Sequence, residues 1–423
     1  MYSVTNTLLR GTIDSIPAKA HAHRALICAA LAPTPSTILL SRTSRDIDAT
    51  MDSLRALGAD ITYKQQIVTV NPGPPPAVGK ILPHESGTTL RLLLPVSASL
   101  CDTVDVDAKG RLPERPLEPL LSEMKRHGVQ FSKNAPPFTM KGLLKGGDFN
   151  MVGDVSSQFF SGLLLAAPQL GHTAITSTTS LQSRDYVTLT LTTMADFGIT
   201  VEHQEATAAQ NETFTINDMS TFVGRNHYQI EGDWSNAAIW MVAAAMTGES
   251  ITITGMNPDS VQADRRIMDI ISASGATITW NGSNLTVSGR ATTPLTIDLD
   301  QCPDLLPVLS ALACSISGES AFINGARLRL KESDRLNAVA KLVSDLGGTV
   351  RQEGDNIYIT GTGSLTGGLA DCVNDHRLVM AGALMALIST NPVRLKDSEA
   401  ITKSYPDFFT DWNLLAGSAT EVY

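Results

Sequence analysis

Two kinds of segment alternate along the whole chain, and both are defined by their pattern of apolar and polar positions. The first kind is a polar turn that opens an apolar helix rich in small residues, followed by a break and a β-type run. Ser, Thr, Asp, Asn or His stands near the start of each one, as helix amino-terminal caps require. We predict six such segments, at residues 21–40, 85–106, 154–175, 232–253, 304–323 and 375–395.

The second kind of segment is an amphipathic helix that ends at a glycine and is followed by a strand of alternating residues. Together the two kinds repeat about every 70 residues, so six units of βαβαββ type account for nearly the whole chain. Five copies of the second kind are complete, and a sixth closes the chain without its strand. These segments are residues 45–64, 115–132, 184–202, 264–280, 332–352 and 404–417.

Six units favour two domains of three, because a single core of this length would be unusually large. No Pro/Ser-rich or charged tether marks the boundary between the domains. The candidate linkers are residues 10–17 and residues 228–233.

Composition excludes several classes of partner. The formal net charge of −10 gives no general field that would hold nucleic acid or an acidic membrane. The apolar runs are shorter than the roughly 20 residues that span a bilayer, and the amino terminus lacks a signal-peptide pattern. The 5 cysteines show no zinc-ligand spacing and favour a reduced compartment. We therefore expect a cytoplasmic protein with no nucleic-acid or membrane partner.

Basic residues nevertheless recur where helices are expected to start. A helix amino terminus favours acidic residues, and a cation there costs about 0.3–1 kcal/mol. The arrangement indicates that several helix ends converge on bound anions. The alternative is that each arginine pairs with a neighbouring carboxylate, such as Arg335 with Glu332. Arg377 with Asp375 would be a second such pair. A further arginine, Arg91, lies deep in an apolar helix, and we assign it a structural role. The cations at helix starts are Arg24, Arg115, Lys331, Arg335, Arg377 and Lys403.

A set of short motifs resembles the 5-enolpyruvylshikimate-3-phosphate synthase family. The motifs occur in the family's order between residues 10 and 410. The combination of KESDRL with NDHR downstream and SSQF upstream is the most specific part. The main motifs are KxxxHR at 19–24, SGTTLR at 86–91, RP at 115–116, SSQF at 156–159, EGD at 231–233, KESDRL at 331–336, NDHR at 374–377 and KSYPDF at 403–408.

The resemblance implies an α/β fold of two similar domains, each of three βαβαββ units, with the active site in the interdomain cleft. The chain would begin in one domain, build all of the other and return, which gives a discontinuous domain of residues 1–15 and 231–423 and an inserted domain of residues 16–230. The implied reaction transfers the enolpyruvyl group of phosphoenolpyruvate to the 5-hydroxyl of shikimate 3-phosphate through a tetrahedral intermediate, releasing phosphate. No metal and no cofactor is implied, and we expect a monomer.

The resemblance also assigns roles to residues of this sequence. Asp304 resembles the base for the 5-hydroxyl and Glu332 the acid for the methylene carbon, while Lys19 could assist either proton transfer. Without the resemblance, Asp304 is typical of a helix cap and Glu332 of a capping or ion-pair residue. Phosphoenolpyruvate would be bound by Lys19, Gly87, Arg115, Gln158, Arg335, Arg377 and Lys403. Shikimate 3-phosphate would be bound by Lys19, Arg24, Ser156, Ser157, Gln158, Ser183, Tyr186, Asp304 and Lys331.

The sequence departs from the family pattern beside the first lysine. Ala20 and Ala22 stand where the family usually has serines, and Glu85 stands where many members have Asn. Loss of one hydrogen bond to a charged ligand costs about 1.5–3 kcal/mol, so weaker shikimate 3-phosphate binding is expected unless His21 or a water substitutes.

Two alternative functions fit parts of the sequence. One is a non-catalytic anion-binding homologue. The other is the related transferase that acts on UDP-N-acetylglucosamine, which uses a loop cysteine ahead of an Arg-Pro; residues 107–116 contain no cysteine. Cys28, within an apolar helix, and Cys101, in an apparent β-run, are both expected in the core.

Overall fold

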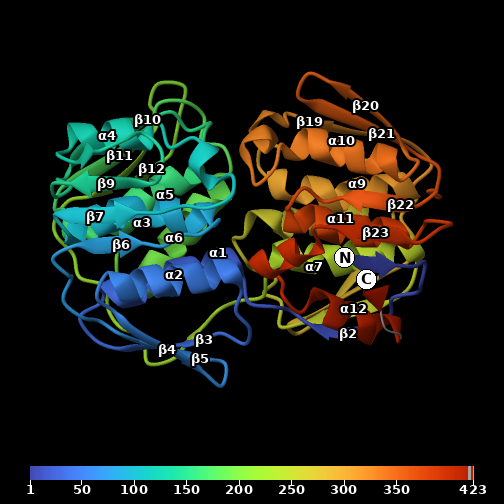
Figure 1. The fold of residues 1–423 in the computed structure, drawn as a ribbon, viewed down its shortest axis with the longest axis horizontal. Coiled ribbons are helices and arrows are strands. Elements are labelled where there is room, and N and C mark those ends of the chain that lie inside the picture. Colours follow the sequence, from blue (N-terminus) through green and yellow to red (C-terminus); the bar gives the residue numbers. More distant parts are fainter. Residues whose placement is uncertain (418–420, 423) are drawn as a thin grey trace. The chain divides into compact units, whose positions relative to one another are not determined.

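The computed structural model describes residues 1–417 and 421–422. The chain divides into two compact units, one made of Met1–Ile16 with Glu231–Tyr423 and the other of Pro17–Ile230. The described strands form six sheets of four strands each, and both chain ends belong to the first of these units (Figure 1).

One sheet of the unit Pro17–Ile230 shows the repeating topology. Strand β6 (Gly79–Ile81) runs parallel to β7 (Thr103–Val106), which pairs antiparallel with β9 (Phe138–Lys141), and β8 (Gln130–Phe131) closes the sheet. Helix α3 (Gly87–Leu100) links the two parallel strands, and α4 (Leu120–Arg126) leads to β8. The order of elements is therefore βαβαββ.

The other two sheets of this unit repeat the pattern. One contains β10 (Gly147–Met151), β11 (Thr173–Ser177), β13 (Glu212–Ile216) and β12 (Glu202–Gln204), with α5 (Ser157–Ala166) and α6 (Arg184–Asp196). The other contains β14 (Tyr228–Gln229), β3 (Ser36–Leu39), β5 (Ile67–Asn71) and β4 (Asp60–Lys64), with α1 (Lys19–Leu31) and α2 (Arg45–Ala56).

The unit Met1–Ile16 with Glu231–Tyr423 also has three such sheets. The first contains β2 (Gly11–Asp14), β15 (Ile251–Thr254), β17 (Asn284–Ser288) and β16 (Thr277–Asn281), with α7 (Trp234–Thr247) and α8 (Ile267–Ala273). The second contains β18 (Thr296–Asp298), β19 (Gly318–Ile323), β21 (Asn356–Gly361) and β20 (Thr349–Glu353), with α9 (Leu306–Ser315) and α10 (Arg335–Asp345). The third contains β22 (Gly368–Asp371), β23 (Val393–Lys396), β1 (Tyr2–Val4) and β24 (Glu421–Val422), with α11 (His376–Ala386) and α12 (Phe408–Ala416).

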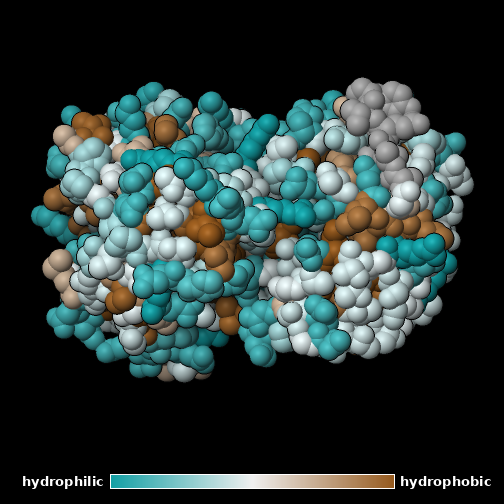
Figure 2. All heavy atoms as spheres, turned by 90° about the horizontal axis from the view of Figure 1, so that it is seen from below, coloured by the Kyte–Doolittle hydropathy of each residue, from teal (hydrophilic) through white to brown (hydrophobic). Residues whose placement is uncertain are grey.

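Each sheet has two kinds of helix in its βαβαββ unit, as the sequence predicts. The first helix is almost wholly buried, as in α7, where the described positions from Asn236 to Met246 are all in the core. The second is amphipathic, as in α2, whose Ile47, Met51 and Leu54 are buried on one face. On the face shown in Figure 2, hydrophilic and intermediate side chains cover most of the surface and hydrophobic patches lie between them.

The structure corrects three local expectations. The sixth unit does have its closing strands, because β1 and β24 both pair within its sheet. Only four of the six apolar helices have a side-chain cap: Ser86, Ser156, Asp233 and Asp375 accept from the first turn, whereas α1 and α9 begin without one. Cys101 ends α3 and does not lie in a strand, although it is buried as expected.

Close packing of α3 on α5 depends on Gly162. A Cβ at this position would lie 2.5 Å from the carbonyl oxygen of Arg91 and 3.2 Å from the Cα of Leu92, both backbone atoms. The two helices can therefore approach only because residue 162 has no side chain. This contact matters for the site because both helices carry candidate binding residues at their amino-terminal ends.

We expect Gly162→Ala to lower the free energy of unfolding by about 1–3 kcal/mol, because overpacking outweighs the gain in helix propensity. Urea unfolding followed by circular dichroism measures this loss. The control is Ser344→Ala on the exposed face of α10, which should stay within about 0.5 kcal/mol of the parent. Equal stability of Gly162→Ala and the parent would contradict the packing argument.

Candidate active site

In the unit Pro17–Ile230, candidate residues gather at the first turn of α3. Gly87 opens the helix, and a Cβ there would lie only 2.7 Å from Nη1 of Arg115. The Arg115 guanidinium therefore lies against the backbone of this turn. Arg115 itself follows a short 3-10 helix (Leu112–Glu114), and α4 begins only at Leu120. The expectation that Arg115 stands at the start of its own helix is wrong, because its cation is at the start of α3.

Gln158 connects this turn to α5. Its Nε2 donates to the Thr88 hydroxyl at 2.9 Å, and its Oε1 accepts from Nη1 of Arg91 at 3.0 Å. The Ser156 hydroxyl caps the same helix by accepting from the Gln158 backbone N–H, and Ser157 is buried beside it. Arg91 therefore has the structural role assigned from the sequence, and the residue it holds is Gln158.

Lys19 is tied to the same turn through Asp46, a residue that the sequence analysis did not single out. Its Nζ donates to Asp46 Oδ2 at 2.8 Å, and the Asp46 backbone carbonyl accepts from the Thr89 hydroxyl at 3.3 Å. The Thr89 hydroxyl also lies 2.9 Å from the hydroxyl of Ser86, the cap of α3. The ammonium of Lys19 is thus held by a network that ends on the helix start where Gly87 lies.

Arg24 lies in the second turn of α1, not in the first as expected, and only 1% of it is exposed. Its guanidinium donates to Thr190 and Ser161 side chains and to the carbonyls of Ala20 and Tyr186. Burial lowers its pKa to about 10, so it stays protonated at neutral pH. Arg24 therefore joins α1 to the start of α6, where Tyr186 lies.

Ser183 precedes α6 in a left-handed conformation, with φ of 52°. Its backbone carbonyl accepts from the Tyr186 N–H at 3.1 Å. The two residues are therefore fixed together at the start of this helix.

The nearby His21 does not replace the hydroxyl missing at Ala20. Its Nε2 lies 2.7 Å from the Tyr228 hydroxyl, which donates to Asp196 Oδ2 at 2.7 Å. Since that hydroxyl proton goes to Asp196, His21 Nε2 is the donor to the tyrosine oxygen. Burial lowers the pKa of His21 to about 4, so the ring is neutral at pH 7. This nitrogen is already used within the fold.

In the unit Met1–Ile16 with Glu231–Tyr423, three cations converge on one carboxylate. Asp304 Oδ1 accepts from Arg335 Nη1 at 2.8 Å and lies 3.1 Å from Lys331 Nζ. Its Oδ2 accepts from Arg377 Nη2 at 3.3 Å. Burial opposes ionisation of Asp304, but these three cations hold its pKa well below the ordinary value. Asp304 lies in a 3-10 helix and caps nothing through its side chain, so the helix-cap interpretation is wrong.

The buried Arg335 guanidinium binds two further carboxylates. Its Nε and Nη2 donate to the two oxygens of Asp375 at 3.0 and 3.2 Å, and Nη2 also donates to Glu332 at 2.7 Å. Burial disfavours the charge, yet these carboxylates raise the pKa of Arg335 above its ordinary value. Glu332 therefore has the ion pair that the alternative interpretation expected.

Asp375, which is 0% exposed, connects this cluster to α11. Its Oδ1 accepts from the Arg377 backbone N–H at 3.0 Å and so caps the helix, and the Ser333 hydroxyl donates to Oδ2 at 2.9 Å. Burial opposes the charge of Asp375, but Arg335 lowers its pKa. The Arg377 side chain binds Asp304, whereas its backbone N–H donates to Asp375. The sequence analysis named Asp375 as a possible partner of Arg377, but not as the main partner of Arg335.

Lys403 is attached to the same helix start. Its Nζ donates to the Asn374 carbonyl at 2.7 Å, and only 6% of the residue is exposed. Asn374 has a left-handed φ of 55°, which turns the chain into the cap residue Asp375. Lys331, Arg335, Arg377 and Lys403 are thus brought together in this unit, with Asp304 and Glu332 among them.

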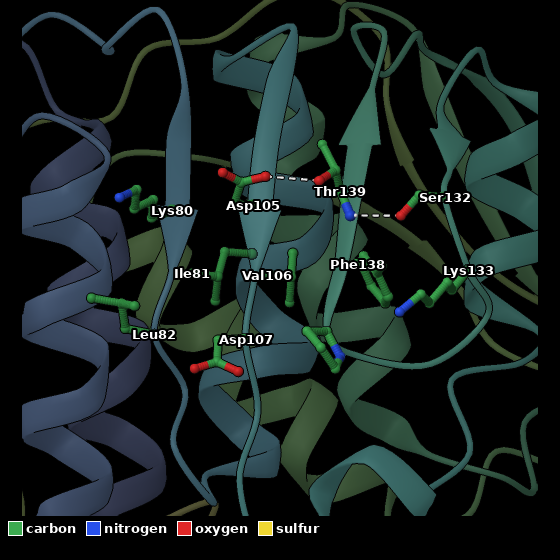
Figure 3. A pocket seen from close by; sticks show the side chains of 11 residues that line it. Lys80, Ile81, Leu82, Asp105, Val106, Asp107, Ser132, Lys133, Phe138 and Thr139 are labelled. Carbon is green, nitrogen blue, oxygen red and sulfur yellow. Dashed lines mark hydrogen bonds between the residues drawn. The ribbon is translucent and has the colours of Figure 1, made fainter.

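A hollow of about 490 Å³ in the unit Pro17–Ile230 is separate from these residues. Figure 3 shows it between β6, β7 and β9, where the Thr139 hydroxyl donates to Asp105 and the Thr139 backbone N–H donates to the Ser132 hydroxyl. Lys80 and Lys133 also line it. None of the candidate residues is part of this lining.

Among the described residues, no helix is long and apolar enough to cross a membrane. The fold and the two clusters define a two-unit α/β protein of repeated βαβαββ sheets, with buried cations at helix starts that suit small anionic ligands. The chain matches the EPSP synthase (3-phosphoshikimate 1-carboxyvinyltransferase) family over residues 5–412 and belongs to that family.

Individual relatives agree with this assignment. The chain is 37% identical to the 3-phosphoshikimate 1-carboxyvinyltransferase of Clostridium kluyveri, with 99% of this chain and 98% of the relative covered. It is 33% identical to the enzyme of the same name from Methanocorpusculum labreanum, with 99% of each covered. The fold matches an EPSP synthase structure from Acinetobacter baumannii with a TM-score of 0.79 at 23% identity, covering 100% of this chain and 99% of that one. The two alternative functions are not favoured.

We expect Asp375→Asn to lower the free energy of unfolding by about 3–5 kcal/mol at pH 7, because it leaves Arg335 with one charged partner fewer in a buried site. The folded-state pKa of Asp375 is lowered, so its contribution is present above the unfolded value near 3.9 and is lost as pH falls below it. The difference from the parent should therefore shrink in acid. Denaturant unfolding at pH 7 and pH 3 measures both effects.

The control is Asp371→Asn, four residues earlier, whose carboxylate pairs with Lys396 at the surface. Such pairs contribute about 0–1 kcal/mol, so this variant should unfold nearly as the parent does. An equal loss in both variants at pH 7 would contradict the special role of the buried pair.

Proposed function

We propose that the two clusters supply the binding and catalytic groups of the family reaction. As an EPSP synthase, the protein transfers the enolpyruvyl group of phosphoenolpyruvate to shikimate 3-phosphate in aromatic biosynthesis. The observation that carries the assignment of residues is the convergence of Lys331, Arg335 and Arg377 on Asp304. A buried group of cations around one carboxylate offers both anion binding and proton transfer.

The proposed phosphoenolpyruvate ligands are charged or amide groups that the structure fixes at helix starts. Cations held by carboxylates and carbonyls need little reorganisation when an anion arrives, which favours binding. The close approach of Arg115 to Gly87 leaves backbone N–H groups of α3 beside a guanidinium. The assigned residues are Lys19, Gly87, Arg115, Gln158, Arg335, Arg377 and Lys403.

The proposed shikimate 3-phosphate ligands include hydroxyl donors at the starts of α5 and α6. Hydroxyls and backbone N–H groups at a helix start bind phosphate well. Arg24 makes four donor contacts within the fold, one of them to the Tyr186 carbonyl, so its guanidinium is fixed before the substrate arrives. The assigned residues are Lys19, Arg24, Ser156, Ser157, Gln158, Ser183, Tyr186, Asp304 and Lys331.

We assign proton transfer to two carboxyl groups in different surroundings. Asp304, with three cations, is proposed to accept the proton of the 5-hydroxyl, and Glu332, with Arg335 as its partner, to protonate the methylene carbon. Lys19 is proposed to assist one of these transfers.

Phosphate release from purified protein given both substrates tests the activity, and Glu332→Gln tests the acid. We expect turnover of the parent and a loss of at least about 100-fold in kcat for the variant, because general acid–base catalysis contributes about 100- to 10,000-fold. The dissociation constant of shikimate 3-phosphate should stay within a few-fold. The control is Glu319→Gln in β19, an exposed carboxylate, which should keep normal turnover. A near-normal rate for Glu332→Gln would contradict the assigned role.

Ala20→Ser tests whether the absent hydroxyl limits substrate binding. Because His21 Nε2 is bound to Tyr228, we expect the new hydroxyl to tighten shikimate 3-phosphate binding by about 10-fold, equivalent to one hydrogen bond to a charged group. Calorimetric titration measures the affinity. Ala22→Ser, which adds the same group at a buried position, should not tighten binding. Equal affinities for Ala20→Ser and the parent would show that another group already fills this role.

Location and assembly are part of the same proposal. We propose that the protein acts in the cytoplasm as a monomer. Support for the location comes from Cys28, Cys101, Cys302, Cys314 and Cys372, which are all buried free thiols. Light scattering of the purified protein measures the assembly state.

A further inference from the structure

Glu85, just before α3, is a side chain that none of the roles above uses. It is half-buried, and its carboxyl end lies against Gly110. A Cβ on that glycine would be 2.7 Å from Oε2 and 2.8 Å from Cδ of Glu85. One residue earlier in each segment, the His84 carbonyl accepts from the Lys109 backbone N–H at 2.6 Å. The chain that enters α3 therefore holds residues 109 and 110 by a backbone hydrogen bond and by a side chain.

Residues 109–115 form a compact turn that connects this contact to Arg115. The backbone N–H of Leu112 donates to the Lys109 carbonyl at 3.2 Å, and the N–H of Arg115 donates to the Leu112 carbonyl at 3.2 Å. The Leu112 side chain is buried and anchors the turn in the core. Because successive hydrogen bonds fix this backbone, a shift at Gly110 also moves Arg115.

Gly110 is suited to the contact in two ways. Its φ of 57° is left-handed, which glycine adopts without strain. Its lack of a Cβ also lets the Glu85 side chain reach the backbone. At the other end of the turn, Arg115 lies against Gly87 in the first turn of α3. The segment that enters α3 and the 109–115 turn therefore touch at both ends.

We propose that Glu85 is a positioning residue for phosphoenolpyruvate: by resting on Gly110, it fixes the 109–115 turn so that the Arg115 guanidinium stands at the first turn of α3. This inference rests on the proposed function, because it takes Arg115 as a ligand of phosphoenolpyruvate. A guanidinium that is already held in place loses less conformational entropy when the anion binds. Glu85 acts on binding through Arg115.

The sign of the effect separates this role from simple charge repulsion. Glu85 stands where many members of the family have Asn, and a carboxylate near an anion site repels the anion. If repulsion were its main effect, removing the carboxylate would tighten phosphoenolpyruvate binding. Removing the support of the turn does the opposite, because it leaves Arg115 less ordered.

The test is the KM for phosphoenolpyruvate of the full chain and of Glu85→Ala, measured by phosphate release at saturating shikimate 3-phosphate. We expect Glu85→Ala to raise this KM by about 10-fold, the size of one weakened hydrogen bond to a charged group. The kcat and the KM for shikimate 3-phosphate should stay within about two-fold of the parent, because the loss concerns the binding of one substrate. Glu85→Gln keeps the length of the side chain and should bring the KM for phosphoenolpyruvate to within about three-fold of the parent.

Gly110→Ala tests the same contact from the other side. The added methyl group displaces the end of Glu85, so the KM for phosphoenolpyruvate should again rise by about 10-fold. The matched control is Gly282→Ala, at a position with a φ of 61° and nothing within 4 Å of the added Cβ. It introduces the same backbone strain without the contact, so it should lose similar stability and keep the KM of the parent.

Glu114→Gln is the control for charge within the same turn. Glu114 is exposed and pairs with Arg111 at 3.4 Å, so this variant should keep a KM for phosphoenolpyruvate within about two-fold of the parent. Trypsin gives a readout that does not depend on activity, because Arg111 is exposed. Cleavage after Arg111 should be several-fold faster in Glu85→Ala than in the parent, because the turn opens more often.

The outcomes separate the two proposals. A parent protein that releases no phosphate from the two substrates overturns the proposed function and this inference with it. Normal turnover of the parent, with a KM for phosphoenolpyruvate that is unchanged or lower in Glu85→Ala, overturns the role of Glu85 alone. An equal rise of KM in Gly110→Ala and Gly282→Ala also overturns it, because strain and not the contact would be responsible.

A raised KM in Glu85→Ala and Gly110→Ala supports the role of Glu85 when both control variants keep the KM of the parent and cleavage after Arg111 is faster in Glu85→Ala. If Glu85→Ala does not fold, the comparison of Gly110→Ala with Gly282→Ala carries the test.

Discussion

One buried guanidinium organises the unit formed by Met1–Ile16 with Glu231–Tyr423. Arg335 begins α10, while Asp375 begins α11 and Asp304 precedes α9, so their ion pairs join the starts of three helices from two sheets. A buried charge is tolerated only when partners of opposite charge surround it. The contacts that stabilise Arg335 therefore also fix where Arg377 and Lys331 lie. Stability and the placement of the candidate site depend on the same few atoms.

In the unit Pro17–Ile230, weaker interactions join the helix starts. Arg115 lies against α3 and Lys19 is tied to it through Asp46, but the groups that join the helix starts are mostly hydroxyls and an amide. Thr88 binds Gln158, and Thr89 binds the Asp46 carbonyl. Hydrogen bonds between neutral groups contribute about 0.5–1.5 kcal/mol each, less than a buried ion pair loses when it is broken. Substitutions in this cluster should therefore affect binding more than folding, whereas those around Arg335 affect both.

The alternation of apolar and amphipathic helices predicted the six sheets because each helix type leaves its own hydrophobic period in the sequence. What the pattern could not show was where strands from distant segments insert. The sheet of α11 is completed by β1 from the amino terminus, and the sheet of α1 by β14 from near residue 228. A strand of two or three residues carries no periodicity. The sequence pattern therefore did not predict the closing strands of the sixth unit, and only the strand pairing in the structure shows them.

Site residues show the same limit. Motifs located Lys331, Glu332 and Arg377, but Asp46, the partner of Lys19, lies in a segment that looks like an ordinary helix start, because an acidic residue in the first turn is favourable in any helix. Arg115 was placed at the wrong helix because the sequence shows which residues precede a helix and not which helix a long side chain reaches. Only tertiary packing brings its guanidinium to Gly87.

The pairing of Asp304 with three cations has a consequence for the proposed chemistry. A carboxylate whose pKa is held well below its ordinary value is a weak base, so Asp304 is poorly suited to accept a proton while Lys331, Arg335 and Arg377 all face it. An anionic substrate bound to Arg377 and Lys331 competes for those cations and reduces their effect on the carboxylate. Its pKa then rises towards the range in which a base is effective. Under the proposed mechanism, the ion pairs keep the cations ordered before binding, and Asp304 becomes a stronger base only once the anion is in place.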